Sequence, residues 1–140
     1  DRFFQWTIQD PSGSYVYAVP TGDSNDISSL ATVSDGNEIS VTGIGSAAGV
    51  ENASNTFNTT ATFNGAGLSS STKAVTTQSD SGTFTTFLLN DTSSTTPSPV
   101  YASEALNDKA GFDSNLYDYQ LLAGDKGGDG ETYEFYLELS

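Results

Sequence analysis

The sequence contains no cysteine, no methionine and no histidine among its 140 residues. The chain therefore has no thiolate nucleophile, no disulfide bond and no imidazole to transfer protons near neutral pH. A serine nucleophile would have no histidine to activate it, and the acidic residues stand in no distinctive catalytic context. We predict a protein without catalytic activity, whose stability comes from its core, from calcium, from glycans or from neighbouring subunits.

Basic residues are also scarce, because four Lys and Arg stand against 18 Asp and Glu, and the net charge is −14. Nucleic acids and anionic membrane surfaces are bound through basic residues, so the sequence predicts that neither is a partner. No apolar run approaches the roughly 18 residues that span a membrane, and membrane insertion is not expected.

The polar character comes mainly from hydroxyl groups, since 20 Ser and 18 Thr are present while charged residues make up 16% of the chain. A polar composition without readily oxidised sulfur side chains is typical of proteins outside the cell. The chain starts at Asp1 rather than at methionine, which the removal of a signal peptide would explain. We therefore predict an extracellular protein, either secreted or held at the cell surface.

Three Asn-X-Ser/Thr triplets offer sites for N-linked glycans, at Asn52, Asn58 and Asn90. Such triplets also arise by chance in a chain with so many hydroxyl residues. Asn58 is expected on the outward side of a strand and Asn90 at a strand end, where glycans can be carried. Glycans are therefore a candidate modification of the surface.

Alternation of apolar and polar residues with a period of two dominates the chain and predicts β-strands. The first two strands, near residues 4–8 and 14–19, are expected to form a hairpin. The dipeptide Asn64-Gly65 follows another alternating segment and predicts a tight hairpin turn. Further strands are expected at residues 39–44, 57–63, 72–78, 82–89, 116–122 and 132–139.

Two segments depart from the alternating pattern. Residues 91–99 are rich in Ser, Thr and Pro and predict a long loop. Residues 103–110 have the composition of a short helix that begins at Ser103.

About eight short strands result, in a chain of the size of a single domain. The 8 Phe, 7 Tyr and 1 Trp supply large apolar side chains for a core. This pattern favours an all-β fold, a two-layer antiparallel β-sandwich of the immunoglobulin-like or jelly-roll type. We predict one such domain over residues 1–140.

The glycine-rich segment 124–131 places three acidic residues close together, at Asp125, Asp129 and Glu131. Calcium prefers oxygen ligands of this kind, and calcium is the one cofactor that the sequence suggests. A helix-loop-helix calcium site is excluded, because Gly127 replaces the middle acid and Tyr136 stands at the last ligand position. A flexible acidic turn without a metal is the alternative.

A second candidate site alternates aromatic and polar side chains, at Tyr117, Asp118 and Tyr119. Aromatic rings beside carboxylates are typical of carbohydrate-binding surfaces. Tyrosines that are half-buried in the core are the alternative interpretation.

The N-terminal segment is aromatic and could mediate self-assembly, through Phe3, Phe4, Trp6 and Ile8. A strand at a chain end can pair with its own sheet or with the open edge of a neighbour. Donation between copies would build a filament head to tail.

We therefore predict a non-enzymatic structural subunit of an extracellular homopolymer, such as a pilus-like filament, a sheath, or a cell-wall or surface layer. The alternative function is that of a carbohydrate-binding module or lectin of the cell surface. The first predicts large homo-oligomers, and the second predicts a small particle that a sugar stabilises.

Overall fold

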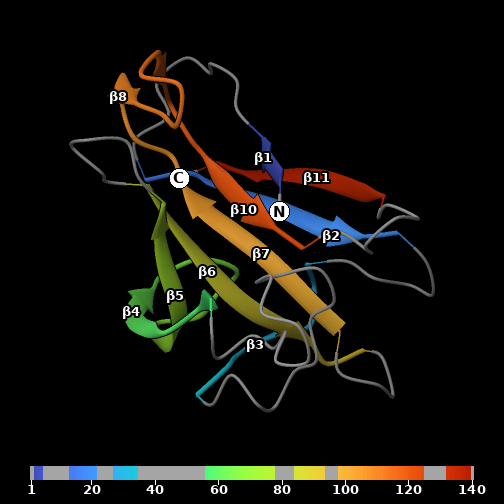
Figure 1. Cartoon of the computed structure of the whole chain (residues 1–140). Helices are drawn as coiled ribbons and strands as arrows, with labels where there is room; N and C mark the ends of the chain where they lie inside the picture. Colours follow the sequence, from blue (N-terminus) through green and yellow to red (C-terminus); the bar gives the residue numbers. More distant parts are fainter. Residues whose placement is uncertain are drawn as a thin grey trace, which may run out of the picture.

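The computed structural model describes residues 2–4, 13–21, 27–34, 56–77, 84–93, 98–124 and 132–139. Its strands all pair antiparallel, so the predicted all-β antiparallel class is confirmed (Figure 1). The immunoglobulin-like or jelly-roll topology stays a prediction. The strands are β1 (Arg2–Phe4), β2 (Tyr15–Pro20), β3 (Leu30–Thr32), β4 (Thr59–Phe63), β5 (Ser70–Thr77), β6 (Phe84–Asp91), β7 (Ser98–Glu104), β8 (Lys109–Ala110), β9 (Leu116–Tyr117), β10 (Leu121–Ala123) and β11 (Tyr133–Glu138).

The main sheet has seven strands in the order β11-β2-β7-β6-β5-β4, with β3 paired to β6 beside β5. Strands β2, β7 and β6 are largely buried on both faces, as in the middle layer of a fold. Tyr15, Tyr17 and Val19 share one face of β2, as their alternation predicts. Two further pairs, β1–β10 and β8–β9, lie outside this sheet.

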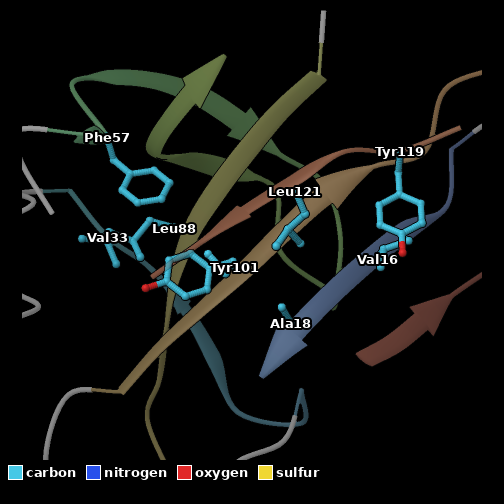
Figure 2. Packing of buried hydrophobic residues seen from close by; sticks show 9 residues of the cluster. Val16, Ala18, Val33, Phe57, Leu88, Tyr101, Tyr119 and Leu121 are labelled. Carbon is cyan, nitrogen blue, oxygen red and sulfur yellow. The ribbon is translucent and has the colours of Figure 1, made fainter. Parts of the chain in front are cut away.

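One face of the main sheet is covered by β10 and by residues from the connecting segments. Leu121 and Ala123 of β10 pack with Val16 and Ala18 of β2 in one buried cluster. At the other end of that cluster the ring of Phe57 stacks on Tyr101, with centroids 5.9 Å apart (Figure 2). This packing places a second layer over the central strands.

The opposite face is covered by the end of the same sheet. Phe63 of β4 packs against Tyr15 of β2, with ring centroids 4.8 Å apart, although three strands separate β4 from β2 in the sheet order. The sheet must therefore curl so that the β4–β5 hairpin folds across the face formed by Tyr15, Tyr17, Phe87 and Leu89.

The curl begins where β5 leaves β6. Strand β5 pairs with the first half of β6, and β3 takes over the same edge of β6 from Leu89 onward. The buried Thr72 hydroxyl lies at this junction, where it donates to the Leu88 carbonyl at 2.6 Å and accepts from the Val33 amide at 2.8 Å. One side chain thus joins β5, β6 and the segment after β3.

A cluster of polar contacts joins the tip of the β4–β5 hairpin to β11, at the other end of the main sheet. The Glu138 carboxylate of β11 accepts hydrogen bonds from the Tyr17 hydroxyl at 2.7 Å and from the Ala66 amide at 2.9 Å. Burial, and then the bond to Glu138, raises the pKa of the Tyr17 hydroxyl far above its usual value, so the hydroxyl remains a donor. The β4–β5 hairpin tip is therefore fastened to the opposite end of the sheet.

The predicted hairpin turn at Asn64-Gly65 is present but displaced along the chain. The two positive φ angles lie at Ala66 and Gly67, and the Leu68 amide donates to the Gly65 carbonyl at 2.8 Å. Gly65 has a different role, because an added Cβ would lie 2.5 Å from the Tyr17 hydroxyl oxygen. Close packing, rather than a positive φ, requires glycine there.

Two other local predictions are wrong. The first two strands do not form a hairpin, because β1 pairs with β10 while β2 lies between β7 and β11. Residues 103–110 are not a helix, but contain the end of β7 and β8. The amides of Ala105 and Leu106 donate to the carbonyls of Ser14 and Asp118, and these distant partners outcompete a short helix.

Replacing Thr72 by Val preserves the shape of the side chain but removes the junction hydroxyl. We expect Thr72→Val to lower the free energy of unfolding by about 1–3 kcal/mol, because two buried backbone groups lose a partner. Chemical denaturation measures this loss. Thr60→Val, at an exposed position, is the control and should stay within about 0.5 kcal/mol of the parent. Equal stabilities of the two variants would contradict the role of Thr72.

Gly65→Ala should destabilise the fold by about 1–3 kcal/mol, because the new methyl group overlaps Tyr17 and Phe63. Removing the hydroxyl in Tyr17→Phe should relieve part of this clash, so the two changes should couple by about 0.5 kcal/mol or more in a double-mutant cycle. Gly67→Ala is the matched control, because it meets open space and suffers only from its φ of +75°. Coupling of Tyr17→Phe to Gly67→Ala instead would refute the packing argument.

Candidate functional site

The N-terminal segment, predicted to assemble, is held by a short ladder within its own chain. Strand β1 contains Phe3 and Phe4, and its partners in β10 are Leu122 and Leu121. Trp6 and Ile8 lie outside the described residues. Within the described part of the chain, β1 pairs with no strand of the main sheet.

Strand β10, the partner of β1, is anchored to the main sheet by packing and by a hydrogen bond. Leu121 is fully buried in the core cluster, and Leu122 is 6% exposed. The Leu122 amide donates to the buried Thr86 hydroxyl of β6 at 3.0 Å. Strand β10 is thus anchored to the main sheet, while the three-residue ladder between β1 and β10 is separate from that sheet's strand order.

The three residues predicted to hold a sugar are separated by their burial. Tyr117 lies on the surface in β9, but Asp118 and Tyr119 are 2% and 0% exposed. Asp118 accepts a hydrogen bond from the Asp108 amide at 3.2 Å, and Tyr119 belongs to the core cluster (Figure 2). The predicted strand 116–122 is broken at Asp118 into β9 and β10, so these side chains form no common platform.

Tyr117 instead joins a polar group at the tip of the β8–β9 hairpin. Its hydroxyl donates to Asp113 at 2.7 Å, and the Asn115 side-chain amide donates to the same carboxylate oxygen at 3.0 Å. These bonds, that from Tyr117 first, lower the pKa of Asp113, while the same contact raises the pKa of Tyr117.

The same hairpin carries apolar side chains that the sequence analysis missed. Phe112 and Leu116 are 63% and 60% exposed. The buried Gln120 holds the hairpin, because its side-chain oxygen accepts from the Phe112 amide at 2.6 Å and its amide donates to Thr77 at 2.8 Å. The turn residues around Phe112 are the signal that would have indicated an exposed ring.

The three sequons lie in different surroundings. Asn58 is exposed, one residue before β4. Asn90 lies inside β6, where its side-chain oxygen accepts from the Ser98 amide at 3.1 Å and the Thr92 hydroxyl of the same sequon donates to the Ser29 carbonyl at 2.8 Å. Asn52 lies outside the described residues. Asn58 is therefore the more accessible of the two described acceptors.

The predicted calcium ligands Asp125, Asp129 and Glu131 lie outside the described residues. Elsewhere in the described ranges, no group of three or more acidic side chains is placed to hold a metal ion. No helix in the part of the chain that the structure describes is long and apolar enough to cross a membrane.

No protein-family model, no curated protein and no solved structure matches this chain. The features of the chain itself that could carry a function are the β1–β10 pair, the β8–β9 hairpin and the two ends of the main sheet.

Expression in a glycosylating secretory host should place a glycan on Asn58 and leave Asn90 unmodified, because Asn90 is already bonded inside a strand. Peptide mass spectrometry of the secreted protein measures both occupancies. Asn58→Gln should remove the added mass, and Asn90→Gln should leave it unchanged. Occupancy at Asn90 with Asn58 empty would contradict the accessibility argument.

Proposed function

We propose that the protein is a secreted, non-enzymatic subunit of an extracellular homopolymer, a filament, sheath or surface layer, in which β1 of one copy pairs with β10 of the next. The observation that carries this proposal is the three-residue ladder of β1 on β10, outside the main sheet. A strand held by so few backbone bonds is released at low cost.

Exchange between copies is nearly neutral in energy, because the donated strand remakes the contacts that it loses. The acceptor needs no rearrangement, since Leu121 and Leu122 keep β10 on the main sheet. Each copy offers one donor and one acceptor, so the contact is heterologous and builds an open chain wherever its rotation does not close a ring. The absence of cysteine and the hydroxyl-rich composition suit such a subunit outside the cell.

A carbohydrate-binding function is the second candidate, and the β8–β9 hairpin is the feature that favours it. The hairpin presents Phe112 to solvent beside the Asp113, Asn115 and Tyr117 group. A sugar that stabilises the parent protein but not Phe112→Ala would support this function, whereas a structural subunit needs no sugar.

A cysteine pair in register across β1 and β10 tests the assembly. Phe3 and Leu122 are direct partners, and the parent chain has no competing thiol. We expect Phe3→Cys/Leu122→Cys protein, oxidised after assembly, to form a ladder of covalent multimers on a non-reducing gel. Successive residue pairs in an antiparallel ladder alternate between hydrogen-bonded and non-hydrogen-bonded geometry. The pair Arg2→Cys/Ala123→Cys tests the other of these two geometries, so at least one of the two cysteine pairs suits a disulfide.

Phe3→Cys and Leu122→Cys alone are the controls, and each can give at most a dimer. Filaments or sheets that contain only intramolecular disulfides would show that assembly does not use β1. Protein that stays a small particle in electron microscopy and sedimentation, with and without calcium, would refute the homopolymer itself.

A further inference from the structure

The negative charge of the chain is distributed very unevenly. All 18 Asp and Glu lie outside residues 52–79, and the one charged residue within that range is Lys73. Strands β4 and β5 both fall in this acid-free stretch. Residues 52–79 therefore carry a net charge of +1, in a chain whose net charge is −14.

No strand among the described residues pairs with the outer edge of β4. Strand β4 ends the main sheet, and among the described residues it pairs with β5 alone. Thr59, Thr60 and Thr62 are exposed, as is Asn58 just before them. Since no described strand uses them, the outward backbone groups of β4 can accept another strand.

Edge strands are normally protected by charges, prolines or bulges, and β4 has none of these. Its five residues are Thr, Thr, Ala, Thr and Phe, and its pairing to β5 runs without interruption from Thr59 to Phe63. Strand β11, at the other end of the sheet, carries Glu134 and Glu138. Among the two ends of the main sheet, β4 is the unprotected one.

We propose that β4 is a self-association edge, at which two copies of this chain pair antiparallel, β4 against β4. This interface is separate from the β1–β10 exchange and does not depend on it. An antiparallel pair of identical strands is self-complementary, since each copy offers the same row of donors and acceptors.

The lack of acidic residues at this edge allows a second copy of the chain to be the partner. Exposed charges are screened beyond about 8–10 Å at physiological salt, so the residues near the contact decide the repulsion. Neither β4 nor β5 contains an acidic residue, so two copies that meet at β4 bring no carboxylates from these strands into contact. The two Lys73 side chains lie on the β5 strands, about 14 Å apart across three strand spacings, so their mutual repulsion is also screened.

The position of β4 is fixed by the contacts at the two ends of the β4–β5 hairpin. Thr72 fixes β5 to β6 at one end of the hairpin, and Glu138 fixes the loop at Ala66 at the other. Little conformational freedom is lost when a strand held in this way accepts a partner. A glycan on Asn58 would stand at the start of the edge and block it.

The test uses full-length Phe3→Cys/Leu122→Cys protein that is refolded and oxidised at high dilution, so that β1 is locked in its own chain. Sedimentation velocity over a concentration series should show a monomer–dimer equilibrium that strengthens with salt. Thr60→Glu/Thr62→Glu should weaken the dimer at least tenfold, because it places four carboxylates at the contact. Asn107→Glu/Thr132→Glu adds the same charge at exposed positions elsewhere and should leave the dimer largely intact.

Amide hydrogen exchange gives a second readout that does not depend on how the variants fold. Dimer formation should slow exchange at residues 59–62. A locked protein that stays monomeric up to millimolar concentration, or equal weakening by both double variants, overturns the proposal. Protection of β4 by a synthetic peptide of residues 2–9, without a dimer of the locked protein, would assign the edge to strand donation instead and also overturn it.

Discussion

The Thr72 hydroxyl is the interaction on which the shape of the main sheet depends. It bonds to backbone groups of Leu88 and Val33 at the point where β5 separates from β6 and β3 replaces it. Because β5 turns away there, the β4–β5 hairpin folds across the face that contains Tyr15 and Tyr17. The fastening to Glu138 and the exposed edge of β4 both follow from that change of direction.

The abundance of hydroxyl residues has a structural explanation within the fold. Thr72, Thr77, Thr86 and Ser103 are all buried, and each makes a hydrogen bond between elements. They attach β3, β10 and the segment around Gln120 to the central strands. In a fold without disulfides, such bonds satisfy buried backbone groups and hold the outer layers in place.

The candidate interfaces share one physical property, which is that each lies where the sheet is incomplete. Strand β1 closes a two-stranded ladder, and β4 ends the main sheet. The central strands, buried on both faces, need neither segment to keep their own pairing. Assembly at these positions could therefore proceed without unfolding the core, which is what a structural subunit requires.

Most of the strands could be read from the alternation, because a side chain's direction along a strand depends on local geometry alone. The alternation before Phe63 correctly placed Thr60 and Thr62 on the outer side, whereas around Tyr15 both sides of the strand are buried. The candidate sites were harder to predict. Asp118 and Tyr119 alternate like a surface strand but are buried, because residues 118–120 bond to segments on either side of them.

The sequence by itself determined the all-β class, the lack of thiol and imidazole chemistry, the strong negative charge and the acid-free stretch around Lys73. Only the tertiary structure decided that β1 pairs with β10, that residues 103–110 contain the end of β7 and β8, and that the acid-free stretch includes the last strand of the main sheet as described. These outcomes depend on hydrogen-bond partners far away in the chain, such as Ser14 for Ala105. A local pattern indicates which side chains a strand would bury. The partner strand with which that strand pairs is decided by the free energy of the whole fold.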